Sequence, residues 1–210
     1  ATGPAGSGGG IHNAGGPFAL LSSIICDNAA GTANGGGKGG GVCNSGGTLI
    51  MSGDILERNR TEYGLRAAGS DGGALCNVSA TSFIDSCTFS FNSAGTFAGI
   101  GRGGAIYNGG PSLNLTNCSI NDNASAGNGG GVCSDAGRLS ATRCIISGNA
   151  ASRDPSSSDG RGGGLYLGDT GTGRLELDTC SIESNAVGRA GRGGGLYVSA
   201  VSASLSNTCI

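Results

Sequence analysis

A short glycine-rich motif recurs seven times along this chain of 210 residues. Each copy has two glycines, a third small residue and then a large aliphatic residue, as in Gly39-Gly40-Gly41-Val42. The third small residues are Gly10, Gly41, Ala74, Ala105, Gly131, Gly164 and Gly195, at intervals of 31, 33, 31, 26, 33 and 31 residues. A repeat of this period is typical of a solenoid, in which each repeat packs only against its neighbours.

Within each repeat, apolar residues alternate with polar ones, which is the periodicity of a β-strand. The clearest copy reads Leu113-x-Leu115-x-x-Cys118-x-Ile120-x-x-Asn123. Consecutive strands of one repeat are not expected to pair, because the same pattern returns in the next copy and pairs with it in parallel. We therefore predict an all-β, single-domain parallel β-helix over residues 1–210, with about seven coils of roughly 31 residues and incomplete first and last coils.

Composition narrows the classes of function. Charged residues make up 12% of the chain and the formal net charge is −2, so the basic excess of nucleic-acid-binding proteins is missing. The sequence has no run of about 18 apolar residues, which predicts no membrane-spanning helix. Cys-x-x-Cys pairs are absent and His12 is the only histidine, so we expect no metal site and no cofactor.

Stacked coils place equivalent residues about 4.8 Å apart, so that each repeat position becomes a column. One column holds asparagines that each follow a large apolar residue by three positions: Asn28, Asn59, Asn92, Asn123, Asn149 and Asn185. Stacked asparagines can hydrogen-bond to one another at a turn. We interpret this column as a structural ladder rather than as a row of ligand-binding amides.

Nine cysteines is a high count for a cytosolic chain of this size. One column holds Cys87, Cys118, Cys144 and Cys180, and a second mixes Cys43, Cys76 and Cys133 with His12, Tyr107, Tyr166 and Tyr197. Adjacent turns bring Cα atoms within disulfide range, so Cys43–Cys76, Cys87–Cys118 and Cys144–Cys180 are the candidate bridges that we expect, although the sequence does not determine the connectivity. The alternative is a ladder of free, buried thiols. The sequence leaves open which way the mixed column faces.

The phrases Gly-Gly-Ala-Ile-Tyr-Asn at 103–108 and Leu-x-Leu-x-x-Cys-x-Ile-x-x-Asn at 113–123 resemble the repeats of polymorphic outer membrane proteins. Similar repeats occur in secreted right-handed β-helix proteins of the pectin-lyase-like superfamily. The resemblance runs from Gly8 to Ile210, and it implies a right-handed coil, an extracellular or cell-surface location and a role as an adhesin or stalk. The chain departs from these repeats where it carries cysteine in place of serine.

A carbohydrate-active β-helix is the alternative function, because lyases and hydrolases that resemble this fold use clustered charges on one face. Glu176 and Asp178 alternate on one predicted strand, but no matching cluster flanks them, and glycoside hydrolysis needs two carboxylates with matched roles. No serine or cysteine nucleophile is tied to His12 by repeat position. We therefore expect no catalysis.

A basic column contains Lys38, Arg102, Arg161 and Arg192, and Asp71 and Asn128 interrupt it. Arg102, Arg161 and Arg192 are candidates for contact with an anionic glycan, and a solvated edge is the alternative reading. Among five Asn-x-Ser/Thr sequons, Asn114 and Asn117 are the candidates for glycosylation, because Asn59 and Asn123 belong to the ladder.

The chain shows no polar cap at either end, and its last residue, Ile210, aligns with Ile120 in mid-repeat. From Ile120 to Gly131 is 11 residues, and from Ile210 into a second copy as far as Gly10 is 10 residues. A head-to-tail copy would therefore continue the turn, as would further coils of a longer chain. We predict a non-catalytic extracellular structural β-helix whose partners are itself and glycans, with no nucleic acid.

Overall fold

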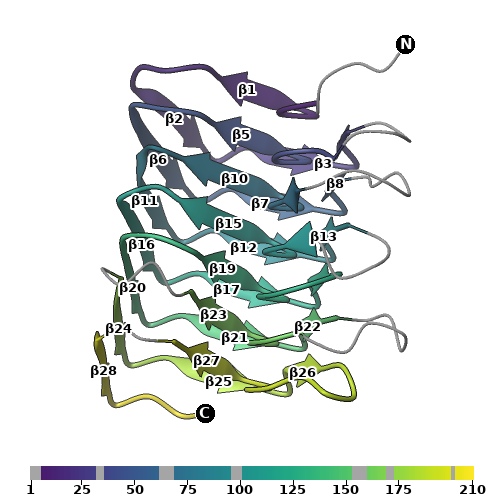
Figure 1. Ribbon diagram of the computed structural model, residues 1–210. Helices are drawn as coiled ribbons and strands as arrows, with labels where there is room; N and C mark the ends of the chain where they lie inside the picture. Colours follow the sequence, from purple (N-terminus) through teal and green to yellow (C-terminus); the bar gives the residue numbers. More distant parts are fainter. Residues whose placement is uncertain are drawn as a thin grey trace.

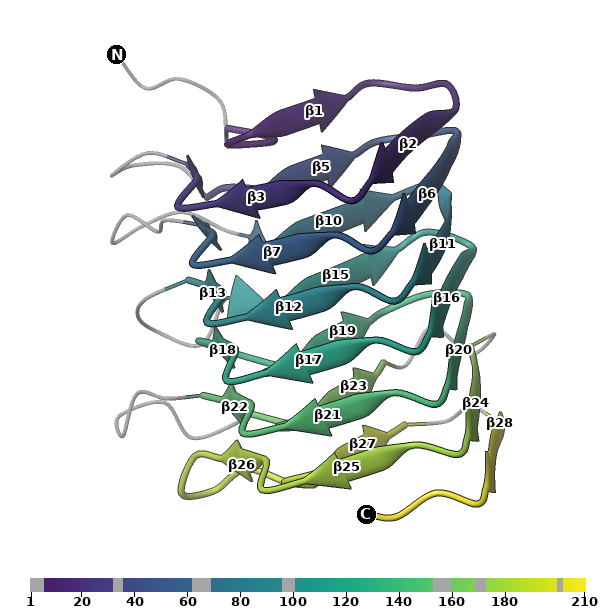
Figure 2. The ribbon, with the colours of Figure 1, turned by 180° about the vertical axis from the view of Figure 1, so that it is seen from behind.

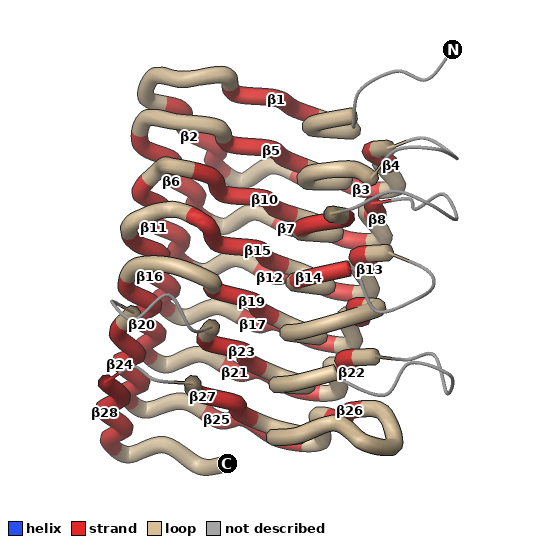
Figure 3. The backbone as a smooth tube through the Cα atoms, viewed as in Figure 1, coloured by secondary structure: helices blue, strands red, loops and turns tan. Residues whose placement is uncertain are grey.

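The computed structural model describes residues 6–31, 36–61, 69–95, 101–152, 160–168, 173–199 and 202–210. They wind into a right-handed parallel β-helix of about seven coils that runs from the N-terminus to the C-terminus (Figures 1 and 2). The described residues form strands and turns without any helix, and therefore without a helix able to cross a membrane (Figure 3). The predicted fold class is confirmed.

Four long parallel sheets run along the rod, and each complete coil adds one short strand to each sheet. Sheet 1 contains β1 (Ile11–Asn13), β5 (Val42–Asn44), β10 (Leu75–Val78), β15 (Ile106–Gly109), β19 (Val132–Ser134), β23 (Leu165–Leu167) and β27 (Leu196–Val198). Sheet 2 contains β2 (Phe18–Leu21), β6 (Thr48–Ser52), β11 (Thr81–Asp85), β16 (Ser112–Thr116), β20 (Arg138–Thr142), β24 (Arg174–Asp178) and β28 (Ser202–Ser206).

The other two long sheets have six strands each. Sheet 3 contains β3 (Ile24–Cys26), β7 (Ile55–Glu57), β12 (Thr88–Ser90), β17 (Ser119–Asn121), β21 (Ile145–Ser147) and β25 (Ser181–Glu183). Sheet 4 contains β4 (Ala29–Ala30), β8 (Arg60–Thr61), β13 (Ser93–Ala94), β18 (Ala124–Ser125), β22 (Ala150–Ala151) and β26 (Ala186–Val187). A short fifth sheet pairs β9 (Ser70–Asp71) with β14 (Gly101–Arg102).

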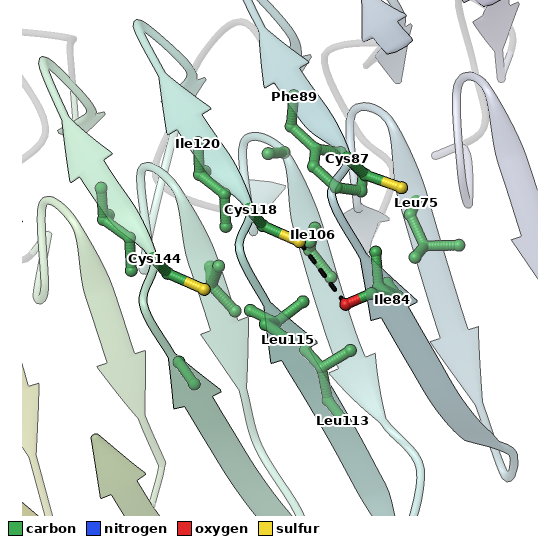
Figure 4. Close-up of a cluster of buried hydrophobic side chains, with 14 of the residues drawn as sticks. Leu75, Ile84, Cys87, Phe89, Ile106, Leu113, Leu115, Cys118, Ile120 and Cys144 are labelled. Atoms are coloured by element: carbon green, nitrogen blue, oxygen red, sulfur yellow. Dashed lines mark hydrogen bonds between the residues drawn. The ribbon is translucent and has the colours of Figure 1, made fainter. Parts of the chain in front are cut away.

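Every strand pairs in parallel and in register with its equivalent one coil away, so identical repeat positions stack. Leu75 of β10, for example, lies opposite Val42 of β5 and Ile106 of β15. Side chains alternate along a strand, and the inward ones form one continuous apolar core along the rod, part of which is shown in Figure 4. One inward column in sheet 3 consists of Ile25, Leu56, Phe89, Ile120, Ile146 and Ile182.

The glycine motif forms the corner that leads into sheet 1, and its first two positions exclude side chains for different reasons. Gly39 has a φ of 62°, in the left-handed region where other residues are strained. Gly40 is packed between two strands, and a Cβ there would lie 2.3 Å from the carbonyl oxygen of Gly73 and 2.4 Å from that of Arg60. The backbone at this corner therefore requires glycine at both positions.

The asparagine column forms a hydrogen-bonded ladder at the corner between sheets 3 and 4. Side-chain Nδ2 to Oδ1 distances are 3.0–3.2 Å along Asn28, Asn59, Asn92, Asn123, Asn149 and Asn185. From Asn59 onward, each Oδ1 also accepts the backbone N–H of the asparagine one coil earlier, at 2.9–3.1 Å. The ladder thus satisfies backbone donors where the chain bends away from strand pairing.

A second ladder, absent from our sequence predictions, lies in sheet 1. It runs from Asn13 through Asn44, Asn77 and Asn108 to the hydroxyl of Ser134, with donor–acceptor distances of 2.7–3.1 Å. These residues each follow the third small residue of the glycine motif by three positions, so the signal was present in the repeat.

All nine cysteines lie among the described residues and are free thiols. The predicted bridges Cys43–Cys76, Cys87–Cys118 and Cys144–Cys180 are therefore wrong. In-register parallel strands hold equivalent atoms about 4.8 Å apart, whereas a disulfide needs Cβ atoms within roughly 3.5–4.5 Å. The core thiols instead donate to backbone carbonyls, as Cys118 does to Thr116 at 3.2 Å and to Ile84 at 3.5 Å (Figure 4).

Candidate functional site

The outer face of sheet 1 carries a column of polar and reactive side chains that take no part in the asparagine ladders. Its mixed column is in register throughout: His12, Cys43, Cys76, Tyr107, Cys133, Tyr166 and Tyr197. Because Leu75 and Ile106 point into the core, Cys76 and Tyr107 point the opposite way. The mixed column therefore faces outward, yet most of it is buried in a small cluster separate from the main core.

A charged column precedes the mixed column by five positions in every repeat: Ser7, Lys38, Asp71, Arg102, Asn128, Arg161 and Arg192. Asp71 lies in register with both Lys38 and Arg102, and Arg161 lies in register with Arg192. The guanidinium of Arg102 lies 4.5 Å from the ring centroid of Tyr107. The charged column is therefore packed beside the aromatic residues of the mixed column.

Arg102 is neutralised within the protein. Its Nε and Nη2 atoms donate to the two carboxylate oxygens of buried Asp71 at 2.9 Å, and its Nη1 donates to Asp135. The hydroxyl of Tyr107 donates to Asp135 at 3.2 Å, and burial raises the pKa of Tyr107 well above its usual range. Asp71, which interrupts the basic column in the sequence, is thus the partner of Arg102, which leaves Arg102 little free charge for a glycan.

Unlike Arg102, the side chains of Arg161 and Arg192 are not neutralised by a carboxylate among the described residues. They place two positive charges on neighbouring coils, and like charges directly opposite each other are destabilising. No carboxylate among the described residues forms an ion pair with either of them. Arg161 lies 5.3 Å from the ring centroid of Tyr197, which stacks on Tyr166 at 5.5 Å. This group, the arginine–tyrosine patch, is suited to binding an anion.

The opposite end of the same face carries a second group of reactive side chains. His12 lies in register with Cys43, and its Nε2 is 3.2 Å from the hydroxyl oxygen of Ser45. That hydroxyl is in turn 3.5 Å from the Cys43 sulfur. Repeat position does not predict the contact of His12 with Ser45, because it crosses between coils and ends two residues after the register partner of His12.

The carboxylates Glu176 and Asp178 do not form a paired acid and base. Glu176 forms ion pairs with Arg138 and Arg174, and a hydrogen bond from Arg138 lowers the pKa of Glu176. Asp178 accepts a hydrogen bond from Ser206 at 2.7 Å, which lowers the pKa of Asp178. A general acid needs a raised pKa, so neither carboxyl has the environment of a proton donor.

The sequon asparagines divide between surface and interior. Asn117 is exposed, and half-buried Asn114 lies on the outward side of sheet 2, between the inward residues Leu113 and Leu115. Asn59, Asn77 and Asn123 are buried in the ladders. Glycosylation of Asn114 and Asn117 stays a prediction.

Within the described ranges, no three His, Cys, Asp or Glu side chains are arranged to hold a metal ion. Comparison of the chain with protein-family models, with curated proteins and with solved structures found no match.

Proposed function

We propose that this chain is a non-catalytic structural β-helix that acts outside the cell, as a fibre of end-to-end copies or as a surface stalk or adhesin. The observation that carries this proposal is the unbroken stacking, from coil to coil, of the core columns and of the asparagine ladder from Asn28 to Asn185. Each coil face is a repeating surface that fits another coil of the same kind.

The last described coil presents a face that another coil fits, whether from a second copy or from a longer chain. Leu205 continues the inward column of Leu177 but is 43% exposed, and Ile210 is 60% exposed. Strands β27 and β28 are the outermost members of their sheets and offer unpaired backbone groups. Unpaired strand edges with apolar side chains favour the addition of another strand.

The lowered pKa values of Glu176 and Asp178 support a non-catalytic role, since these carboxyls lack the environment of a general acid. The extracellular location rests on the resemblance of the repeats. The cysteine count no longer supports it, because the thiols are free.

Light scattering after size-exclusion chromatography, together with electron microscopy, tests the stacking. We expect the mass to rise with concentration and fibres to form. Leu205→Glu should abolish both, because it places a charge on the end face. Ile50→Glu is the matched control, since Ile50 is 48% exposed on the lateral face of sheet 2. A wild-type protein that stays a monodisperse monomer at high concentration, without fibres, would contradict the proposal.

The arginine–tyrosine patch favours a second candidate function, binding of an anionic glycan. The expected ligand is a polysaccharide with carboxylate or sulfate groups, which bind guanidinium groups well. We expect the double variant Arg161→Gln, Arg192→Gln to lose binding to polygalacturonate, and wild-type binding to weaken with salt. Arg138→Gln, which removes a charge already paired with Glu176, is the control. Equal binding by wild type and double variant, or equal binding of neutral dextran, would refute this function.

A further inference from the structure

At the N-terminal end of sheet 1, the side chains of Ser45 and His12 connect the buried sulfur of Cys43 to solvent. Cys43 is 1% exposed, and its sulfur contacts the half-buried hydroxyl of Ser45, which contacts the exposed imidazole of His12. Neither asparagine ladder includes these three side chains. The arrangement provides a path for a proton between Cys43 and water.

The surroundings of Cys43 favour its ionised form. The neighbouring thiol of Cys76, one coil away, is the main cause that lowers the pKa of Cys43 to about 6. Ser45, His12 and Lys38 act in the same direction, whereas burial opposes them. Cys76 is the converse case, because its hydrogen bond to Cys43, its burial and the negative charge of Asp71 raise its pKa.

Other thiols lack this combination. The pKa of Cys133 is raised by its burial. A hydrogen bond from Cys144 lowers the pKa of Cys180 to about 6, but the Cys180 sulfur lies in the apolar core, 3.4 Å from each of two backbone carbonyl oxygens. Among the described contacts, a thiol in contact with a hydroxyl that leads to an imidazole occurs at Cys43 alone.

We propose that Cys43 is an oxidation site that reacts with hydrogen peroxide to form a sulfenic acid. The thiolate sulfur attacks one peroxide oxygen, an S–O bond forms and the O–O bond breaks. The leaving hydroxide takes a proton that passes from His12 through the Ser45 hydroxyl, and it departs as water. Sulfur is oxidised by two electrons and peroxide is reduced. Hydrogen peroxide is a small, uncharged oxidant, whereas bulky reagents do not reach a thiol that is 1% exposed.

The sulfenic acid is the expected product rather than a disulfide with Cys76. In-register strands hold the two residues about 4.8 Å apart, beyond the Cβ separation that a disulfide tolerates. Cys76 also remains a protonated thiol, and the thiolate is the form that attacks sulfur.

The test treats the whole chain with one equivalent of hydrogen peroxide, followed by catalase. The protein is then unfolded in dimedone, which traps sulfenic acids, and the labelled peptides are measured by mass spectrometry. We expect dimedone mainly on Cys43, with a rate that levels off above pH 7. In Ser45→Ala and His12→Gln the rate at pH 7 should fall, by roughly tenfold for each unit by which the thiol pKa rises above the pH.

Ser140→Ala, on the outward side of sheet 2, is the control and should react like the wild type. His12→Gln keeps the test decisive if Ser45→Ala fails to fold, because His12 is exposed. Labelling of Cys43 no greater than that of Cys133 or exposed Cys209 would overturn the proposal. So would unchanged rates in both variants, or a Cys43–Cys76 disulfide as the main product.

Discussion

At the scale of the residue, the backbone requires glycine at the first two positions of the motif, and the reason differs between them. Gly39 needs its left-handed φ, whereas Gly40 needs the space that a side chain would occupy. Not every glycine carries such a constraint. A Cβ on Gly46, in the turn between β5 and β6, would meet only the Cα of Gly15, at 3.5 Å.

Gly40→Ala should therefore destabilise the protein, by about 1–3 kcal/mol, since overpacking of a close backbone contact forces strands apart. Gly46→Ala in the same coil should change the unfolding free energy by less than about 0.5 kcal/mol. Urea unfolding followed by circular dichroism measures both. Equal effects of the two substitutions would show that close approach is not the reason for the motif.

Cys43 gives a pH-dependent prediction at the same scale. Its pKa falls from an ordinary value of 9.0 to about 6 on folding, so its ionisation stabilises the folded state fully above pH 9. That contribution is lost as the pH falls through 6. The stability advantage of the wild type over Cys43→Ser should therefore grow between pH 5 and pH 8.5, as measured by urea midpoints. A constant difference over that range would argue against a thiolate at Cys43.

At the scale of the element, the two asparagine ladders stabilise corners and strand ends that backbone pairing leaves unsatisfied. Asn92 shows the arrangement: its Oδ1 accepts the backbone N–H of Asn59 at 2.9 Å, and its Nδ2 donates to the carbonyl oxygen of Leu56 at 2.9 Å. Both partners belong to the coil before, so the ladder joins neighbouring coils.

Asn92→Ala should leave the Asn59 N–H buried without an acceptor, at a cost of about 1–3 kcal/mol. Asn114→Ala removes half-buried hydrogen bonds to Ser82 and Ser112 on the outward side of sheet 2 but leaves no backbone N–H without its acceptor, so it should cost only about 0.5 kcal/mol. Thermal unfolding of both variants is the measurement. A loss for Asn114→Ala as large as that for Asn92→Ala would mean that the ladder position has no special role.

At the scale of the whole molecule, burial decreases toward the C-terminal end of the rod. Strand β28 is exposed at all five positions and β27 is half-buried, whereas the inward residues of β15, β16 and β17 are fully buried. A terminal coil has a neighbour on one side only, so it loses fewer contacts when it opens.

Hydrogen exchange should follow this gradient. We expect amides in residues 101–152 to exchange slowest and those in residues 192–199 and 202–210 to exchange fastest, as measured by mass spectrometry of peptic fragments. Stacking of copies should slow exchange at the C-terminal end selectively. Uniform exchange along the rod would indicate that it opens as a single cooperative unit.

The repeat was sufficient to predict the coil, its strands and the columns, because stacking in register follows from a constant period. Outside the asparagine column, it did not predict how side chains meet across coils. The pairing of Arg102 with Asp71 and Asp135, and the contact between His12 and Ser45, depend on rotamers and on residues offset from the column. The disulfide prediction failed for a related reason: the spacing of Cα atoms was suitable, but in-register strands keep the Cβ atoms too far apart.

Both ladders have a direction, since a ladder amide donates to the ladder residue of the following coil, which is an asparagine except at Ser134. A duplicated coil that carries both ladder asparagines, inserted where both ladders run, would keep these bonds, because its amide oxygens accept from the coil before and its amide nitrogens donate to the coil after. The gene for such a chain can therefore grow or shrink by whole turns without a new core having to evolve. Selection can thus change the length of the rod by adding or removing whole coils, while the sequence of the remaining coils stays the same.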